Sequence, residues 1–181
     1  PIYAYGTEAQ KQLYVRAIAE GREIGAFALT EPQSGSDATA MRCRAVKQAD
    51  GTFVINGKKS WITSGPVAKY IVLFAMSEPD KGAKGITAFL IDTAREGFHR
   101  GKTEPKLGIR ASATCEIEFT DYVVQADEVL AGVVGELERS IESALAPISR
   151  ARVEGMVKDD TPGAEALLWV VDHRANHVNT L

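Results

Sequence analysis

The chain has 181 residues, of which 45% are hydrophobic, so it is long and apolar enough for one domain with a substantial core. A charged fraction of 25% and a formal net charge of −3 are typical of globular chains and indicate no nucleic-acid partner. No apolar stretch approaches the roughly 18 residues of a membrane-spanning helix, so we expect no membrane span. The sequence starts Pro1-Ile2-Tyr3, with neither Met nor a basic leader, which favours a processed chain or a fragment.

The predicted elements begin with a helix at 7–20, because Thr7 and Gln10 make a capping box and Gly21 is typical of the position beyond a helix end. Strands are expected where apolar runs or alternating apolar and polar residues occur, at 24–29, 40–46, 52–55, 70–76, 86–91 and 115–119. Two dipeptides, Asp50-Gly51 and Asn56-Gly57, are typical of hairpin turns.

Turn signals, and not helices, join these strands. This predicts a mainly β fold, an antiparallel β-barrel or sandwich flanked by a short N-terminal helix and a helical C-terminal tail. We expect three segments: helical residues 1–23, a β domain at 24–135 and the tail at 136–181. The tail is predicted to be helical from the charge pattern of 136–145 and from a helix start at Thr161-Pro162.

Cysteine and histidine offer little for a disulfide framework or a metal site. Cys43 and Cys115 form no CxxC pair; a disulfide between them is possible, but two buried free thiols in a reducing compartment are the expected state. His173 and His177 are four residues apart and can share a helical face, but no third ligand stands near them. We therefore predict no metal site.

Two predicted strands end in clusters of small polar residues that can hold a cofactor. The first is 27–37, Phe-Ala-Leu-Thr-Glu-Pro-Gln-Ser-Gly-Ser-Asp, where Gly35 permits close backbone approach and Thr30 and Ser36 carry hydroxyl donors. In the second, 61–65, Trp61 can stack on a flat ring beside the hydroxyl of Thr63. Each cluster alone is typical of a capped turn or of a core Trp beside a surface Thr. Together they favour a planar cofactor with a pyrophosphate.

The same residues carry a resemblance to the middle β-barrel domain of the acyl-CoA dehydrogenases, FAD-dependent enzymes that desaturate acyl-CoA thioesters. Residues 28–37 match the family's first signature, and 59–65 resemble its second flavin-contacting segment, which usually ends in Thr-Asn-Gly where this chain has Thr-Ser-Gly. Residues 82–90, 106–112 and 119–121 are similar to further markers of that domain. The resemblance covers residues 1–135, and 1–23 would be the remnant of the family's N-terminal helical domain.

The resemblance implies a flavin site built from both clusters. The expected cofactor-binding residues are Phe27, Ala28, Leu29, Thr30, Gly35, Ser36, Trp61, Ile62 and Thr63. Of these, Thr30 would reach the pyrimidine edge of the flavin, Trp61 would pack against the isoalloxazine, and Thr63 would donate to its N5 atom. Gly35 and Ser36 would approach the phosphates of FAD, and Ser36 would also lie near the acyl-CoA substrate.

The implied function is α,β-desaturation of an acyl-CoA thioester: a carboxylate removes an α proton and a hydride passes to the flavin. In most family members that carboxylate is a Glu of a C-terminal four-helix domain. Residues 136–181 are too short to form this domain, and we do not expect their sequence to resemble it. No catalytic residue is therefore assigned, and the chain is expected to be a fragment or a truncated form. The alternatives are a non-catalytic binding or interaction module that reuses the barrel, and a dehydrogenase completed by a separate helical subunit.

The family also implies partners and a location. The expected electron acceptor is an electron-transfer flavoprotein, and the expected location is the cytoplasm in a bacterium or the mitochondrial matrix in a eukaryote. Residues 58–130 most resemble the short-chain and branched-chain members. Apolar surface where a helical bundle would dock leads us to expect a homo-oligomer or a helical partner.

Overall fold

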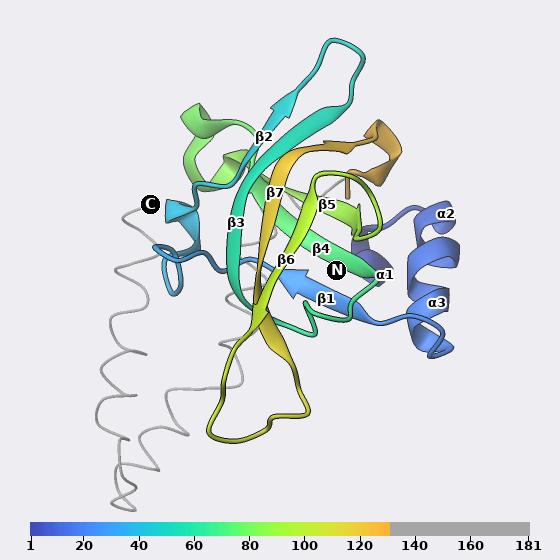
Figure 1. The fold of residues 1–181 in the computed structure, drawn as a ribbon. Coiled ribbons are helices and arrows are strands. Elements are labelled where there is room, and N and C mark those ends of the chain that lie inside the picture. Colours follow the sequence, from blue (N-terminus) through green and yellow to red (C-terminus); the bar gives the residue numbers. More distant parts are fainter. Residues whose placement is uncertain (131–181) are drawn as a thin grey trace, which may run out of the picture. The chain divides into compact units, whose positions relative to one another are not determined.

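The computed structural model describes residues 1–130; the predicted tail, His173 and His177 lie outside this part of the chain. The described residues fold into a curled sheet with an N-terminal helical segment beside it (Figure 1). The strands are β1 (Gly25–Ala28), β2 (Arg44–Lys47), β3 (Phe53–Thr63), β4 (Tyr70–Met76), β5 (Ile86–Asp92), β6 (Phe98–Thr103) and β7 (Thr114–Val124). Short 3-10 turns occur at Ala38–Ala40 (η2), Pro79–Gly85 (η3) and Ala126–Glu128 (η4). No described helix is long and apolar enough to cross a membrane.

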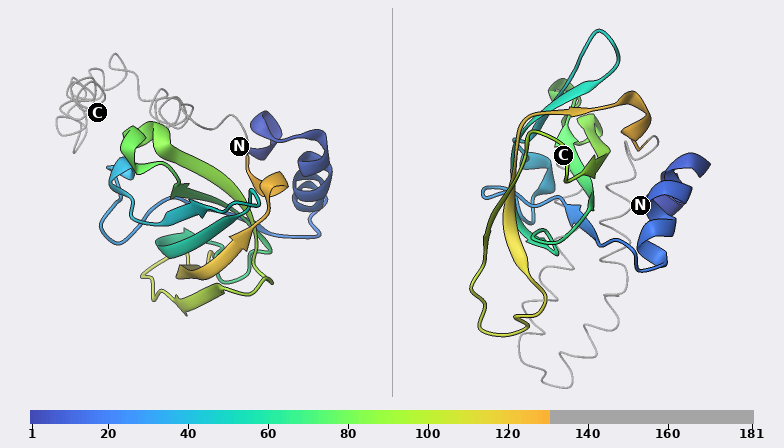
Figure 2. Two further views of the ribbon diagram at one scale, coloured as in Figure 1. Left: turned by 90° about the horizontal axis from the view of Figure 1, so that it is seen from above. Right: turned by 45° about the vertical axis from the view of Figure 1, so that its right-hand side comes forward.

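The helical segment begins with α1 (Ile2–Tyr5), which the sequence did not predict, and continues as α2 (Glu8–Gln10), the π-helical turn η1 (Lys11–Val15) and α3 (Arg16–Ala19). The predicted capping box is present: the Thr7 amide donates to Oε1 of Gln10 over 2.9 Å, and the Gln10 amide donates to Oγ1 of Thr7 over 3.2 Å. Gln10 also donates through Nε2 to the carbonyl of Asp127 over 2.7 Å. This hydrogen bond joins the helical segment to η4, and the two lie side by side in Figure 2.

The sheet runs in the order β1-β4-β2-β3-β7-β6, and β5 pairs with β4. The mainly β fold is confirmed, but the expectation of an all-antiparallel sheet needs correction, because β4 runs parallel to both β1 and β2. The chain reaches β4 only after the β2–β3 hairpin, and a strand that returns through such a crossover can lie parallel to its neighbour. The remaining pairings, β2–β3, β3–β7, β4–β5 and β6–β7, are antiparallel.

The prediction of a hairpin turn at Asn56-Gly57 was wrong, whereas the turn at Asp50-Gly51 joins β2 to β3 as expected. Strand β3 continues through Gly57, and its pairing with β7 shifts register between Ile55 and Gly57. Gly57 has φ of 145°, and a Cβ there would lie 2.7 Å from the Cα of Cys43. This glycine therefore allows a bulge and a close backbone approach, and it does not mark a turn.

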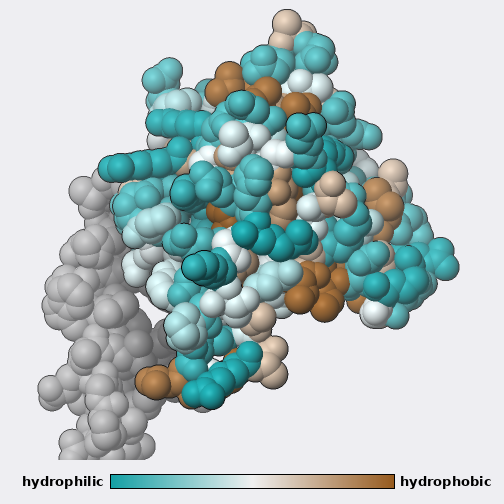
Figure 3. Space-filling model, in the orientation of Figure 1, coloured by the Kyte–Doolittle hydropathy of each residue, from teal (hydrophilic) through white to brown (hydrophobic). Residues whose placement is uncertain are grey.

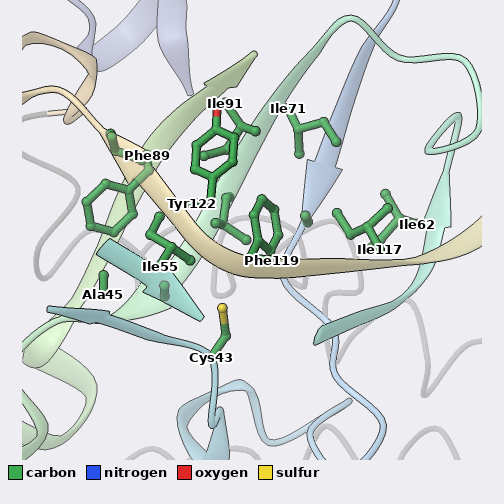
Figure 4. Close-up of a cluster of buried hydrophobic side chains, with 14 of the residues drawn as sticks. Cys43, Ala45, Ile55, Ile62, Ile71, Phe89, Ile91, Ile117, Phe119 and Tyr122 are labelled. Carbon is green, nitrogen blue, oxygen red and sulfur yellow. The ribbon is translucent and has the colours of Figure 1, made fainter. Parts of the chain in front are cut away.

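The core lies on the inner face of the curled sheet (Figure 4). The expected alternation is confirmed in two strand segments, because Cys43 and Ala45 are buried on one and Ile117 and Phe119 on the other. Both cysteines are buried free thiols, so the disulfide alternative does not occur. Burial raises the pKa of Cys43 to about 12.

Candidate cofactor-binding site

The two polar clusters predicted from the sequence lie against each other in the fold. The loop that follows β1 reaches the last third of β3, where the Ser60 amide donates to the carbonyl of Thr30 over 2.9 Å. One residue earlier on each segment, Nζ of Lys59 donates to the carbonyl of Leu29 over 2.8 Å. The end of β1 and the end of β3 are thus joined at consecutive positions, as a shared binding site requires.

A buried ion pair lies at this junction. Lys59 Nζ is 2.7 Å from Oε1 of Glu31, and the two side chains are 0% and 2% exposed. The Glu31 carboxylate also accepts from the amides of Arg42 over 2.6 Å and Cys43 over 3.0 Å, and from the side chain of Gln33 over 2.6 Å. Burial by itself raises the pKa of Glu31, but the hydrogen bonds from Lys59, Arg42 and Cys43 outweigh it, so the net pKa is lowered. Glu31 is therefore held as a carboxylate.

This ion pair was not predicted from the sequence, although one signal in the sequence indicates it. Lys58 and Lys59 are consecutive in a strand whose side chains alternate between faces, so one of the two must point inward. Lys58 faces outward, 3.2 Å from Glu118 on β7, and the two side chains are about half exposed, at 56% and 45%. The inward lysine needs a buried partner of opposite charge, and Glu31 is the carboxylate that the loop brings to it.

The predicted site residues divide into outward and inward side chains. Phe27, Trp61 and Thr63 are exposed, with Trp61 at 64%, whereas Ala28 and Ile62 are buried in the core. For Phe27 and Ala28, and for Ile62 and Thr63, this follows from strand alternation, because neighbouring residues point to opposite faces. Ala28 and Ile62 can therefore offer a ligand their backbone alone, while the three outward residues can offer side chains.

The loop residues of the first cluster are more open. Leu29 and Thr30 are half-buried, whereas Gly35 and Ser36 are exposed. A Cβ added to Gly35 would meet no atom within 4 Å, so there is open space beside this backbone. Within the described residues, the hydroxyl groups of Thr30 and Ser36 have no hydrogen-bond partner and are available to a ligand.

Trp61 has an unusual backbone conformation, with φ of 61°. For a bulky residue this left-handed conformation is strained, and such strain persists only where the surroundings fix it. The register of β3 against β7 shifts between Lys59 and Ile62, and the Ser60 hydroxyl donates to Oε1 of Glu116 over 3.0 Å. A bulge therefore turns the indole outward while the residues on either side stay anchored.

Phe27 and Thr63 both line a groove of about 550 Å³ between the N-terminal helical segment and the sheet. Its other lining residues are Pro1, Ile2, Tyr3, Tyr14, Val15, Ile18, Ala19, Gly25, Ala26, Ser64, Tyr70, Ile71, Val72 and Leu90. Gly35, Ser36 and Trp61 are not part of this lining. None of the described residues that line the groove is acidic.

Comparison with known proteins identifies the family to which this architecture belongs. The sequence model of the family described as "Acyl-CoA dehydrogenase, middle domain" matches residues 26–122. The chain belongs to the acyl-CoA dehydrogenase family. A curated relative, the short-chain specific acyl-CoA dehydrogenase of Megasphaera elsdenii, is 40% identical over 168 residues, which are 93% of this chain and 43% of the relative.

Solved structures of acyl-CoA dehydrogenases have the same fold. Butyryl-CoA dehydrogenase from Megasphaera elsdenii matches with a TM-score of 0.74 and 41% identity over 78% of this chain and 37% of that chain. A glutaryl-CoA dehydrogenase from Mycobacterium smegmatis, solved in complex with FADH2, matches with a TM-score of 0.66 and 36% identity over 71% of this chain and 32% of that chain. The chain thus spans less than half the length of these family members.

The residues present fit the flavin of an acyl-CoA dehydrogenase. A planar ring needs an aromatic surface and donors at its edge, and the outward indole of Trp61 and the exposed hydroxyl of Thr63 supply these on one strand end. The Thr30 loop is fixed beside them through the Ser60 amide. By contrast, no group of three His, Cys, Asp or Glu among residues 1–130 is placed to hold a metal ion.

Proposed function

We propose that this chain forms the flavin-facing part of an acyl-CoA dehydrogenase that binds FAD and acts on an acyl-CoA thioester. The observation that carries the proposal is the junction of the Thr30 loop with the end of β3, which presents Trp61 and Thr63 outward next to it. The family membership supports the same reaction class. Because the relative from Megasphaera elsdenii is named as short-chain specific, a short-chain acyl-CoA is the first substrate to test.

Bound FAD would accept the hydride that leaves the β carbon of the substrate. The chain's own residues would bind and orient the flavin: the Trp61 indole would cover one side of the ring, and the hydroxyls of Thr63 and Thr30 would donate to its polar edges. Donors fixed in advance at those edges stabilise negative charge without reorganisation. Gly35 and Ser36 would approach the phosphates, and Ser36 also the acyl-CoA.

The base that removes the α proton is not assigned to any of residues 1–130. A base must lie within hydrogen-bond reach of that proton, and the groove that contains Phe27 and Thr63 has no acidic residue in its described lining. We propose that a carboxylate from a helical region of the family, in the same or another polypeptide, completes the site, and that an electron-transfer flavoprotein takes up the electrons.

Titration of the purified chain with FAD, followed by flavin absorbance, tests the proposal. The unmodified chain should bind FAD and perturb its spectrum. W61A should raise the Kd about 5-fold or more, because stacking on an aromatic side chain contributes ~1–3 kcal/mol. The matched control is V46A. It truncates an exposed apolar residue on a different strand, β2, and should leave the Kd unchanged. No binding of FAD to the unmodified chain would refute the proposal for this chain alone.

A further inference from the structure

We propose that Glu31 and Lys59 are positioning residues for the flavin, acting as a buried clamp that sets the spacing between the Thr30 loop and Trp61. The inference rests on the proposed function and goes beyond it, because neither side chain is exposed enough to touch a cofactor. Each acts through the backbone that it holds.

The contacts of the pair explain why a buried ion pair is present at this point. Such a pair is a weak source of stability, since the desolvation of both charges offsets much of their attraction, and its best-attested use is to fix one arrangement. Lys59 holds the Leu29 carbonyl in addition to Glu31. The second partner of Glu31 is the backbone, through the amides of Arg42 and Cys43. The clamp therefore fixes the chain before and after the polar loop and fastens both points to β3.

The strained residue Trp61 lies two positions beyond Lys59, which makes its geometry depend on the clamp. Between them Ser60 donates its amide to Thr30 and its hydroxyl to Glu116. Beyond Trp61, Ile62 is buried in the core. Anchors at Lys59, Ser60 and Ile62 thus flank the left-handed residue. The Ser60 amide holds one point of the opposing loop, the Thr30 carbonyl, whereas the clamp holds that loop on both sides, at Leu29 and at Arg42 and Cys43. Without it, we expect the bulge to relax and the indole to move relative to Thr30.

If the pair had a purely structural role, its loss would lower stability without a specific effect where the Thr30 loop meets the end of β3. The experiment must therefore separate a structural role from a positioning role. The variants are K59M and the nearly isosteric E31Q, and the matched control is K69M. Lys69 pairs with Asp92 over 2.6 Å, but these side chains are 30% and 31% exposed and belong to neither polar cluster. E31Q keeps a side chain of the same shape, so it remains informative where K59M fails to fold.

The first readout is hydrogen exchange of the Ser60 amide, which needs no cofactor. K59M and E31Q should increase its rate about 10-fold or more relative to K69M, because its acceptor, Thr30, is no longer held in place. The second readout is the Kd for FAD, which should rise about 10-fold in both variants and stay within about two-fold in K69M.

The outcomes distinguish the clamp from the proposed function. If the unmodified chain binds no FAD, the proposed function fails for this chain, while Ser60 exchange still decides whether the pair positions the loop. If the chain binds FAD, and exchange and Kd in K59M and E31Q match those of K69M, the pair is structural only and the inference is overturned. A faster Ser60 exchange with an unchanged Kd overturns the flavin-positioning role as well.

Discussion

At the scale of single residues, charge and burial at Glu31 decide how the site is built. A carboxylate that is 2% exposed is tolerable because a lysine and two backbone amides compensate its charge. The amides come from Arg42 and Cys43, so one side chain connects the polar loop to the segment that leads into β2. The same contacts make this group sensitive to acid.

Glu31 should make the fold acid-sensitive in a defined pH window. Its folded pKa is lowered, by the hydrogen bonds that outweigh burial. Its contribution to stability is thus complete above the unfolded value of about 4.3 and is lost as the pH falls through the folded pKa. Urea unfolding at pH values from about 6 down to 3 would measure this. As the pH falls, the free energy of unfolding should decrease more steeply in the unmodified chain than in E31Q, and the two slopes should differ by up to ~1.4 kcal/mol per pH unit. E118Q, which changes a carboxylate whose side chain is about half exposed, should follow the unmodified chain. Equal slopes in all three proteins would contradict the prediction.

At the scale of elements, the local signals in the sequence were enough for the strongly patterned strands. The apolar run 70–76 coincides with β4, and the alternation around Cys115 predicted part of β7. By contrast, β6 was missed, because most of its side chains are exposed and it carries no apolar periodicity. Parallel pairing of β1 with β4 was also missed, since local sequence patterns do not indicate which strands, distant in sequence, pair with each other. For the site, the two polar clusters were found, but the Glu31–Lys59 pair depends on a contact 28 residues apart in sequence.

Strand β3 offers a direct test of its bulge. G57A should destabilise the fold strongly, because Gly57 has φ of 145° and an added Cβ would lie 2.7 Å from the Cα of Cys43. The control is G51A in the β2–β3 turn, where φ is 88° but no atom lies within 4 Å of an added Cβ. We expect G51A to cost about 1 kcal/mol in the free energy of unfolding, and G57A about 2 kcal/mol more. Urea unfolding would measure both, and equal losses would show that the backbone approach to Cys43 relaxes without cost.

At the scale of the whole molecule, the question is what the apolar surface of residues 1–130 does. The face in Figure 3 is mostly hydrophilic, with hydrophobic residues in separate small patches. Around the groove, however, three large exposed apolar side chains share one rim: Tyr3 at 79%, Ile18 at 37% and Phe27 at 47%. The β6–β7 connection projects from the sheet (Figure 1) and carries Leu107, which is fully exposed. Apolar rims of this kind are typical of surfaces that another protein surface covers.

We therefore expect the chain to self-associate through the groove rim. In sedimentation velocity, the weight-average sedimentation coefficient should rise between about 5 and 100 μM, because association buries the exposed apolar side chains. Y3S/I18S should reduce this rise, since it removes two of the three large apolar side chains of the rim while leaving Phe27 in place. L107S is the matched control: it removes an exposed apolar side chain that does not line the groove, and it should associate like the unmodified chain. A monomer throughout the concentration range would contradict the expectation, and an equal reduction in L107S would move the contact away from the groove.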